Sequence, residues 1–260
     1  MKLTRSIYLV GGGVWGGMGL SPGPDCNVYL LDGGDALALV DTGSGTPASV
    51  DAICAQIEAD GFDPARIGTV LLTHMHGDHA GGAARFAELT GAVVRGSALT
   101  ADVLARGDEE ASSVRLAREA GVFPADFELR PLAGIETVAA GDVITVGRLT
   151  VEAVDTPGHC DGHVSFVVRS EGRADLLAGD AVRGPAQAEE EADEVRLAGQ
   201  QVHVSSADRR GMDTHDHLVV GARRHRPRRF RVLQRLGAAI AGLQDRVHGH
   251  CGGGASGGRG

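Results

Sequence analysis

The sequence predicts an α/β fold in which two β-sheets pack face to face and helices cover them from outside. Predicted strands and helices interleave without the regular βαβ repeat of a parallel sheet, which argues against a doubly wound fold. Aromatic residues make up only 3% of the chain and apolar residues 42%. The core is therefore expected to consist of Val, Leu, Ile and Ala, and 260 residues are enough to bury it as one domain.

Three strands and a helix are predicted near the N-terminus. The strands are Ile7–Val10, Asn27–Leu31 and Ala36–Val40. The turn sequence Asp32-Gly33-Gly34-Asp35 joins the last two, which predicts an antiparallel hairpin. Thr46 and Pro47 then supply an N-cap and a first-turn proline for a helix that ends near Gly61.

Short strands and helices alternate in the middle of the chain before a run of strands begins. Periodicity predicts a buried strand at Thr69–Leu72, a short helix at Ala80–Leu89, a strand at Ala92–Val94 and a solvent-facing helix at Glu109–Ala120. Further strands are predicted at Ile135–Val138, Val143–Val146, Leu149–Val154, Val164–Val168 and Leu176–Ala178. Turn residues separate these strands.

A dense group of metal-binding side chains follows the strand at Thr69–Leu72. The run Thr73-His74-Met75-His76-Gly77-Asp78-His79-Ala80-Gly81-Gly82 places three imidazoles and a carboxylate within six residues. Such donors suit Zn²⁺, Fe or Mn, and four of them exceed what one ion usually takes from so short a segment. The glycines permit backbone turns that let the side chains converge. Two ions sharing this loop are therefore expected.

Two later strand ends also offer metal-binding side chains. Asp155-Thr156-Pro157-Gly158-His159 follows the strand Leu149–Val154, and Gly179-Asp180 follows the last predicted strand. Each is a weak signal alone. Their occurrence in this order after the His-rich loop is specific.

The glycine-rich start of the chain imitates a dinucleotide-binding motif. Gly11–Gly16 matches G-x-G-x-x-G after a strand, and Asp32 ends the next strand. Gly and Pro residues between Gly16 and Cys26 preclude the helix whose N-terminus would hold a pyrophosphate. We therefore expect a flexible loop near the site instead of a nucleotide site.

The chain resembles the metallo-β-lactamase-fold hydrolase superfamily over about residues 5–183, and within it the glyoxalase-II-like and lactonase-like branch. The residues that carry the resemblance are Val40-Asp41-Thr42-Gly43, Thr73–Gly82, Thr156-Pro157-Gly158-His159 and Gly179-Asp180. The resemblance implies an αββα four-layer sandwich of two mixed β-sheets with helices outside.

The resemblance also implies a dinuclear centre of two Zn²⁺ per chain, with iron or manganese as alternatives. It assigns His74, His76 and His159 to one ion, Asp78 and His79 to the other, and Asp180 to both. Asp41 would orient the ligand loop without binding metal.

The family's last ligand is a His in a Pro-Gly-His-Gly turn near the C-terminus, and this chain departs from that pattern. No Pro-Gly-His follows Asp180. His250 occupies the equivalent place, with His248, His215 and His217 as rivals.

Residues 1–183 are thus expected to form the domain, followed by an atypical segment at 184–260. This segment has an acidic stretch at 189–194, an Arg-rich stretch at 209–235, a low-complexity end and no clear alternating strand. It is interpreted either as divergent or disordered, or as read out of frame beyond about residue 183, which translation of the alternate frames would decide. The apolar residues between Phe230 and Leu243 have approximate helical spacing, which predicts one amphipathic helix.

The reaction implied by the resemblance is hydrolysis of an ester-type bond, a lactone or an acyl thioester, by a metal-bound hydroxide. Asp78 is the candidate catalytic residue that orients the water or passes its proton. The first alternative is a mononuclear non-haem iron persulfide dioxygenase. The second is an impaired metal-binding protein with little activity, because the final His is in question.

Cys160 and His163 follow the ligand motif closely. A thiolate nucleophile at Cys160 is disfavoured because no partner of a cysteine-hydrolase arrangement can be assigned. His163 is expected to pack or to form hydrogen bonds and not to bind metal.

Charge and cysteine usage bound the partners and the compartment. A net charge of −9 disfavours nucleic acid, which leaves a small-molecule substrate as the expected partner, with the oligomeric state open. Four cysteines without C-x-x-C spacing suggest a reducing cytoplasm. No stretch reaches the length of a membrane span, so no membrane association is expected.

Overall fold

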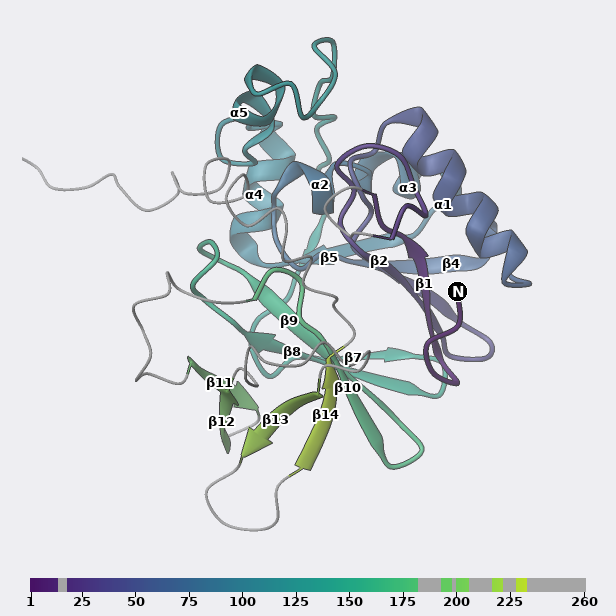
Figure 1. Cartoon of the computed structure of the whole chain (residues 1–260), viewed down its shortest axis with the longest axis vertical. Coiled ribbons are helices and arrows are strands. Elements are labelled where there is room, and N and C mark those ends of the chain that lie inside the picture. Colours follow the sequence, from purple (N-terminus) through teal and green to yellow (C-terminus); the bar gives the residue numbers. More distant parts are fainter. Residues whose placement is uncertain (14–17, 182–192, 198–199, 206–216, 222–227, 233–260) are drawn as a thin grey trace, which may run out of the picture.

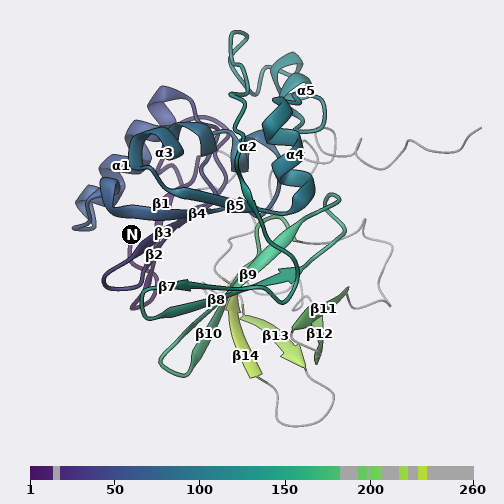
Figure 2. The ribbon, with the colours of Figure 1, turned by 180° about the vertical axis from the view of Figure 1, so that it is seen from behind.

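Two β-sheets and a set of helices form the layered structure of the computed structural model. It describes residues 1–13 and 18–181 and, after them, four strands at 193–197, 200–205, 217–221 and 228–232. The helices lie on one side of the first sheet, and the second sheet lies on the other side (Figures 1 and 2). The predicted class, an α/β sandwich of two mixed sheets with helices outside, is confirmed.

The first sheet holds six strands in the order β1-β2-β3-β4-β5-β6. Their bounds are β1 Ile7–Gly11, β2 Val28–Asp32, β3 Leu37–Val40, β4 Ile67–Leu71, β5 Val93–Gly96 and β6 Glu136–Thr137. The first three strands are antiparallel, as the predicted hairpin requires, and the pairs from β3 to β6 are parallel.

Helices connect the parallel strands of this sheet, because such strands need a crossover between them. Their bounds are α1 Pro47–Ala59, the 3₁₀ turn η1 Pro64–Arg66, α2 Gly77–Ala80, α3 Ala83–Thr90, α4 Ala98–Arg106 and α5 Val114–Glu119. As predicted, Thr46 caps α1, and its hydroxyl oxygen accepts a hydrogen bond from the Ser49 backbone N–H. Gly91 and Gly107 end α3 and α4 in the left-handed conformation that glycine adopts without strain.

The second sheet has the strand order β11-β12-β13-β14-β10-β9-β8-β7. Its bounds are β7 Val143–Val146, β8 Leu149–Asp155, β9 Val164–Ser170, β10 Arg173–Leu177, β11 Asp193–Leu197, β12 Gln200–Ser205, β13 His217–Gly221 and β14 Arg228–Val232. The pair β10 and β14 is parallel, and the other neighbours are antiparallel. Both sheets are therefore mixed.

Apolar side chains fill the spaces on both sides of the first sheet. Ile53 of α1 and Phe86 of α3 pack with Leu39 and other residues on its helix-covered face. On the opposite face, Leu31 packs with Phe166 of the second sheet. Val167, the neighbour of Phe166 in β9, is buried as well. These layers hold the ends of β4, β8 and β10 in fixed positions.

The structure differs from the sequence prediction in three places. It contains α4, which was not predicted although Ser97 and Gly107 mark its two ends. The predicted helix at 80–89 is divided into α2 and α3, and only Val114–Glu119 of the predicted helix at 109–120 is helical. In the last two cases a glycine or a turn limits the helix more tightly than apolar spacing suggests.

The prediction for the C-terminal segment was wrong in two respects. Four strands follow residue 192 where no clear strand was expected, and β14 includes Phe230 and Val232, which had been assigned to an amphipathic helix. Phe230 and Val232 are two residues apart, a spacing that suits a strand. The remaining residues of the predicted helix, up to Leu243, lie outside the described part of the chain. In the described residues, no helix is both long and apolar enough to span a membrane.

Replacing Phe166 by Ala tests the packing between the sheets. Phe166 is fully buried, and the Phe166→Ala variant is expected to lose about 3–5 kcal/mol of unfolding free energy. Val143→Ala on β7 is the control, because Val143 is 59% exposed and its truncation should cost less than about 1 kcal/mol. Denaturant unfolding measures both, and equal losses would contradict the assigned core.

Candidate metal centre

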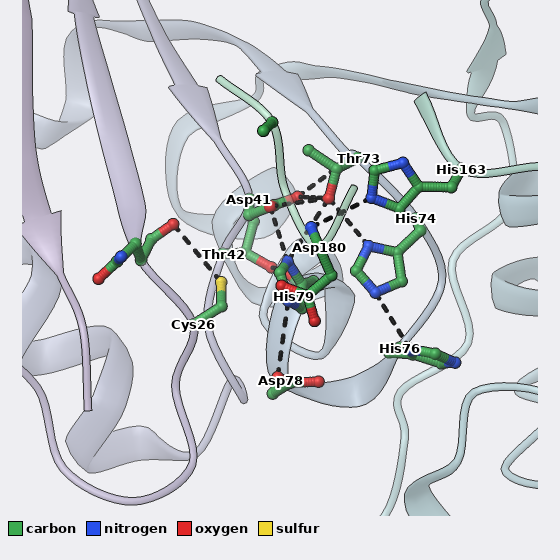
Figure 3. Close-up of polar contacts among 12 residues, drawn as sticks. Cys26, Asp41, Thr42, Thr73, His74, His76, Asp78, His79, His163 and Asp180 are labelled. Carbon is green, nitrogen blue, oxygen red and sulfur yellow. Dashed lines mark hydrogen bonds and ion pairs between the residues drawn. The ribbon is translucent and has the colours of Figure 1, made fainter. Parts of the chain in front are cut away.

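The His-rich loop leaves the end of β4 and meets residues from the ends of β8 and β10. β4 ends at Leu71, and the loop then supplies His74, His76, Asp78 and His79. His159 comes from the segment after β8, and Asp180 from the segment after β10. Figure 3 shows these loop residues and Asp180 gathered around one region.

Three imidazole nitrogens form the first group of donors. His74 Nε2 and His159 Nε2 each lie 3.0 Å from His76 Nδ1. Nitrogens bound to one tetrahedral Zn²⁺ at 2.0–2.1 Å would be about 3.3 Å apart, close to this spacing. The group therefore fits one zinc ion after a shift of a few tenths of an ångström.

Asp78, His79 and Asp180 form the second group. His79 Nε2 lies 3.6 Å from Asp78 Oδ2 and 3.4 Å from Asp180 Oδ1. The other oxygen of Asp180, Oδ2, lies 3.5 Å from His159 Nε2 of the first group. One carboxylate thus presents a different oxygen to each group.

Two atoms of the second group have no hydrogen-bond partner although they are buried. These atoms are Asp78 Oδ2 and His79 Nε2, and their separation of 3.6 Å is too long for a hydrogen bond between them. An unsatisfied buried polar atom costs about 1–3 kcal/mol. A cation bound between them would satisfy both atoms, so the residues present fit a second metal ion.

Asp41 holds the loop in place from behind. Its Oδ1 accepts a hydrogen bond from the Thr73 backbone N–H at 2.8 Å, and its Oδ2 lies 2.9 Å from Thr73 Oγ1 and 2.8 Å from His79 Nδ1. This carboxylate accepts a hydrogen bond from His79 Nδ1–H, so that a neutral His79 would direct its Nε2 lone pair at the second group. Asp41 adopts a positive φ of 57°. This conformation is uncommon for a non-glycine residue, and it occurs most often at functional sites.

A second hydrogen bond orients His74 in the same way. His74 Nδ1 lies 3.0 Å from Thr73 Oγ1, whose hydroxyl can donate to Asp41. With its proton on Nδ1, neutral His74 directs the lone pair of Nε2 at His76 and His159. Asp41 therefore acts on both donor groups, directly on His79 and through Thr73 on His74.

Burial and nearby charge set the protonation of the site. Burial and the neighbouring imidazoles hold the pKa of His74 well below its usual value, and burial also lowers the pKa of His159. Burial raises the pKa of Asp78 to about 7. Burial alone would lower the pKa of His79, but the Cys26 thiol, the Asp180 carboxylate and other acidic groups outweigh it and hold that pKa well above its usual value. The acidic side chains around His79 thus favour a positive charge, which a metal ion would supply.

Close backbone contacts fix the loop against the rest of the domain. The Thr42 backbone N–H donates to the carbonyl oxygen of His79, and the Cys26 backbone N–H donates to that of Asp78. A Cβ atom on Gly81 would lie 2.3 Å from the carbonyl oxygens of Gly77 and Ser44, so only glycine fits there. This crowding explains the glycines that follow the histidines.

The structure brings six of the seven predicted ligands together and leaves the seventh undescribed. The six are His74, His76, Asp78, His79, His159 and Asp180. His250 lies outside the described residues, as do its rivals His248 and His215, and the side chain of His217 is not described, so the final ligand stays a prediction.

Two cysteines lie closer to the donor groups than the sequence analysis proposed. Cys160 Sγ lies within 4.8 Å of the donor nitrogens of the first group, and Cys26 Sγ lies within 4.8 Å of donor atoms of Asp41 and His79. The position of Cys160 directly after His159 in the sequence already indicated that Cys160 would lie near the first group. Nothing in the sequence near Cys26 indicated the second, because the loop that carries it reaches the site only in the fold.

The glycine-rich decoy motif does not precede a helix in the described residues. β1 ends at Gly11, and residues 18–27 contain no helix. The Gly13 backbone N–H donates to the carbonyl oxygen of Asp25. Residues 14–17, which include the end of the motif, lie outside the described part.

The chain is similar to members of the metallo-β-lactamase superfamily. A family model described as the metallo-beta-lactamase superfamily matches residues 22–232, a range that continues past residue 183. The lactamase-like protein aptB of Emericella nidulans is 32% identical over 182 residues, which cover 70% of this chain and 47% of aptB. The atrochrysone carboxyl ACP thioesterase of Aspergillus chevalieri is 29% identical over 183 residues, 70% of this chain and 47% of that protein. The chain thus spans about half the length of these curated relatives.

Solved structures show the same relationship. A metallo-β-lactamase of Cronobacter sakazakii matches with a TM-score of 0.55 and 27% identity, over 68% of this chain and 62% of that one. The subclass B3 metallo-β-lactamase MEM-A1, from a soil metagenome library, matches with a TM-score of 0.52 and 26% identity, over 68% and 60% of the two chains.

Replacing Asp41 by Asn tests its role in orienting the loop. The amide nitrogen of Asn cannot accept the proton of His79 Nδ1, so Asp41→Asn is expected to lower zinc affinity about 10- to 100-fold. Chelator competition measures the affinity. Asp126→Asn, at an exposed position, is the matched control and should bind zinc like the parent. Unchanged affinity in Asp41→Asn would show that the loop holds its geometry without this carboxylate.

Proposed function

Because this chain belongs to the metallo-β-lactamase superfamily, we propose that it is a hydrolase with two zinc ions that cleaves an ester-type bond, an acyl thioester or a lactone. The observation that carries the proposal is the position of Asp180, whose two oxygens lie 3.4 and 3.5 Å from nitrogens of different donor groups. A carboxylate shared in this way suits a pair of ions.

The described residues would hold the two ions in separate groups joined by one side chain. His74, His76 and His159 would hold the first ion, Asp78 and His79 the second, and Asp180 both. When bound, zinc supplies a Lewis acid for the substrate carbonyl and a water whose pKa falls to about 7. His250 remains our candidate for the last ligand.

Asp78 has the position that we assign to proton handling. It is buried, and its Oδ2 lies on the His79 side without a hydrogen-bond partner. A carboxylate oxygen so placed can orient an attacking water or take its proton. Its backbone carbonyl oxygen is held by the Cys26 backbone N–H, so the chain fixes its position before substrate binds.

Zinc is the ion that we propose because the donors combine imidazoles and carboxylates, with the Cys160 thiol nearby. Imidazole and carboxylate also suit iron and manganese, but a thiol at the border of the first group favours zinc over manganese. One iron per chain, together with oxygen consumption on a persulfide, would replace this proposal by the dioxygenase.

An acyl substrate is proposed from two supports. One relative is named as an ACP thioesterase, which makes an acyl thioester the first bond to test. The net charge of −9 also makes a nucleic-acid substrate unfavourable, because phosphates would be repelled. We therefore propose a small-molecule or carrier-linked acyl substrate.

Replacing His76 by Ala tests the metal centre. His76 Nδ1 lies between two other donor nitrogens, so His76→Ala is expected to lower the metal content and to abolish turnover. Elemental analysis of purified protein and a thioester assay measure the two effects. Glu128→Ala, at an exposed position, is the control and should retain both metal and activity. Full retention of metal and turnover in His76→Ala would rule out this centre.

A substrate panel tests the bond that is cleaved. The zinc-loaded protein is expected to hydrolyse acyl thioesters or lactones, and metal removal by a chelator should stop the reaction until zinc is restored. Product release is followed by free thiol for thioesters and by acid release for lactones. Hydrolysis of neither class by protein that holds two zinc ions would contradict the proposed substrates.

A further inference from the structure

A chain of hydrogen bonds lies behind Asp180, between the ends of β8, β9 and β10. The Asp180 backbone N–H donates to His163 Nε2 at 3.2 Å, and His163 Nδ1 lies 2.7 Å from Thr156 Oγ1. Thr156 Oγ1 lies 2.9 Å from Ser165 Oγ, which donates to the carbonyl oxygen of Ala178 at 3.0 Å. This series of hydrogen bonds therefore begins and ends on the short segment that carries Asp180. Figure 3 shows His163 beside Asp180 and Thr73.

The two end groups of this hydrogen-bond series determine the direction of every hydrogen bond in it. A backbone N–H only donates, so His163 Nε2 must accept from Asp180, and the proton of the neutral ring is on Nδ1. From the other end, Ser165 uses its single proton on Ala178 and must accept from Thr156. The Thr156 oxygen is then left to accept from His163. Both ends give the same assignment.

Water has little access to this hydrogen-bond series. His163 and Ser165 are fully buried, and Thr156 is 5% exposed. Gly179 has a φ of 56°, and a Cβ atom there would lie 2.9 Å from His163 Nε2. The backbone before Asp180 is thus pressed against the ring, so a lost hydrogen bond could not be replaced by solvent without a local rearrangement.

We propose that His163 is a positioning residue that sets the backbone at Asp180 and thereby directs each carboxylate oxygen to its own donor group. The two oxygens lie 3.4 and 3.5 Å from nitrogens of different groups, so a small rotation of the segment would favour one group over the other. The inference rests on the proposed dinuclear site. Groups that orient metal ligands commonly act in this way.

The tautomer of His163 is the first test, and it needs no metal. In metal-free protein, ¹⁵N-detected imidazole spectra should show neutral His163 with its proton on Nδ1, and the signal is identified by its loss in His163→Asn. Thr156→Val removes the acceptor of that proton and should shift its resonance, while the Asp180 backbone N–H still requires Nε2 to accept and so keeps the proton on Nδ1. A proton on Nε2 in the parent would overturn the proposal, because Nε2 could not then accept from Asp180.

The second test compares two substitutions at Thr156. Thr156→Val is expected to weaken binding of the second zinc equivalent about 10- to 100-fold, with the first equivalent held nearly as in the parent. Thr156→Ser keeps the hydroxyl and should restore the second equivalent. Thr150→Val, at an exposed position of β8, is the matched control and should bind both like the parent. Zinc titration against a chelator measures each equivalent.

The outcomes separate this inference from the proposed function. A second zinc held equally well by Thr156→Val and the parent would overturn the positioning role. A parent that binds only one zinc would overturn the dinuclear proposal, and the tautomer in metal-free protein would then decide the hydrogen-bond assignment by itself. Circular dichroism of each variant shows that a loss of zinc is not a loss of fold.

Discussion

The buried carboxylate of Asp41 is the interaction on which the site depends. It accepts hydrogen bonds from the Thr73 backbone and from His79, residues that are 32 and 38 positions away in the chain. One group thereby joins the end of β3 to both ends of the His-rich loop. Because the group is buried and its partners are fixed, the loop cannot relax without leaving a charge unpaired. The positive φ of Asp41 is the local strain that this arrangement maintains.

The direction of the hydrogen bonds explains why the donors face one region. His79 Nδ1–H donates a hydrogen bond to Asp41, and His74 Nδ1 contacts Thr73, so each ring presents Nε2 to the site. The Nε2 atom of His79 faces the carboxylates of Asp78 and Asp180, and the Nε2 atom of His74 faces His76 Nδ1. Such crowding of acceptors is unfavourable by itself, and it becomes favourable around cations. His163 is oriented in the same way: its Nδ1 pairs with Thr156, and its Nε2 accepts a hydrogen bond from the Asp180 backbone N–H.

Sequence reasoning predicted the sheets better than the helices and the tail. Alternating or continuous apolar runs located every strand up to β10, because a strand's burial is visible over a few residues. The helix α4 was missed although its capping residues Ser97 and Gly107 are readable, since its buried residues include only two large apolar side chains, Val103 and Leu104. The strands after residue 192 were missed because their pairing with β10 through β14 is a contact between distant segments.

The sequence by itself determined which side chains offer donor atoms and which strands they follow, because the motifs are local and their residue types carry the chemistry. Only the tertiary structure decided that His159 lies 3.0 Å from His76, 83 positions earlier, and that the two oxygens of Asp180 face different groups. Those distances depend on how the two sheets pack, and packing is a property of the whole core that no short motif encodes.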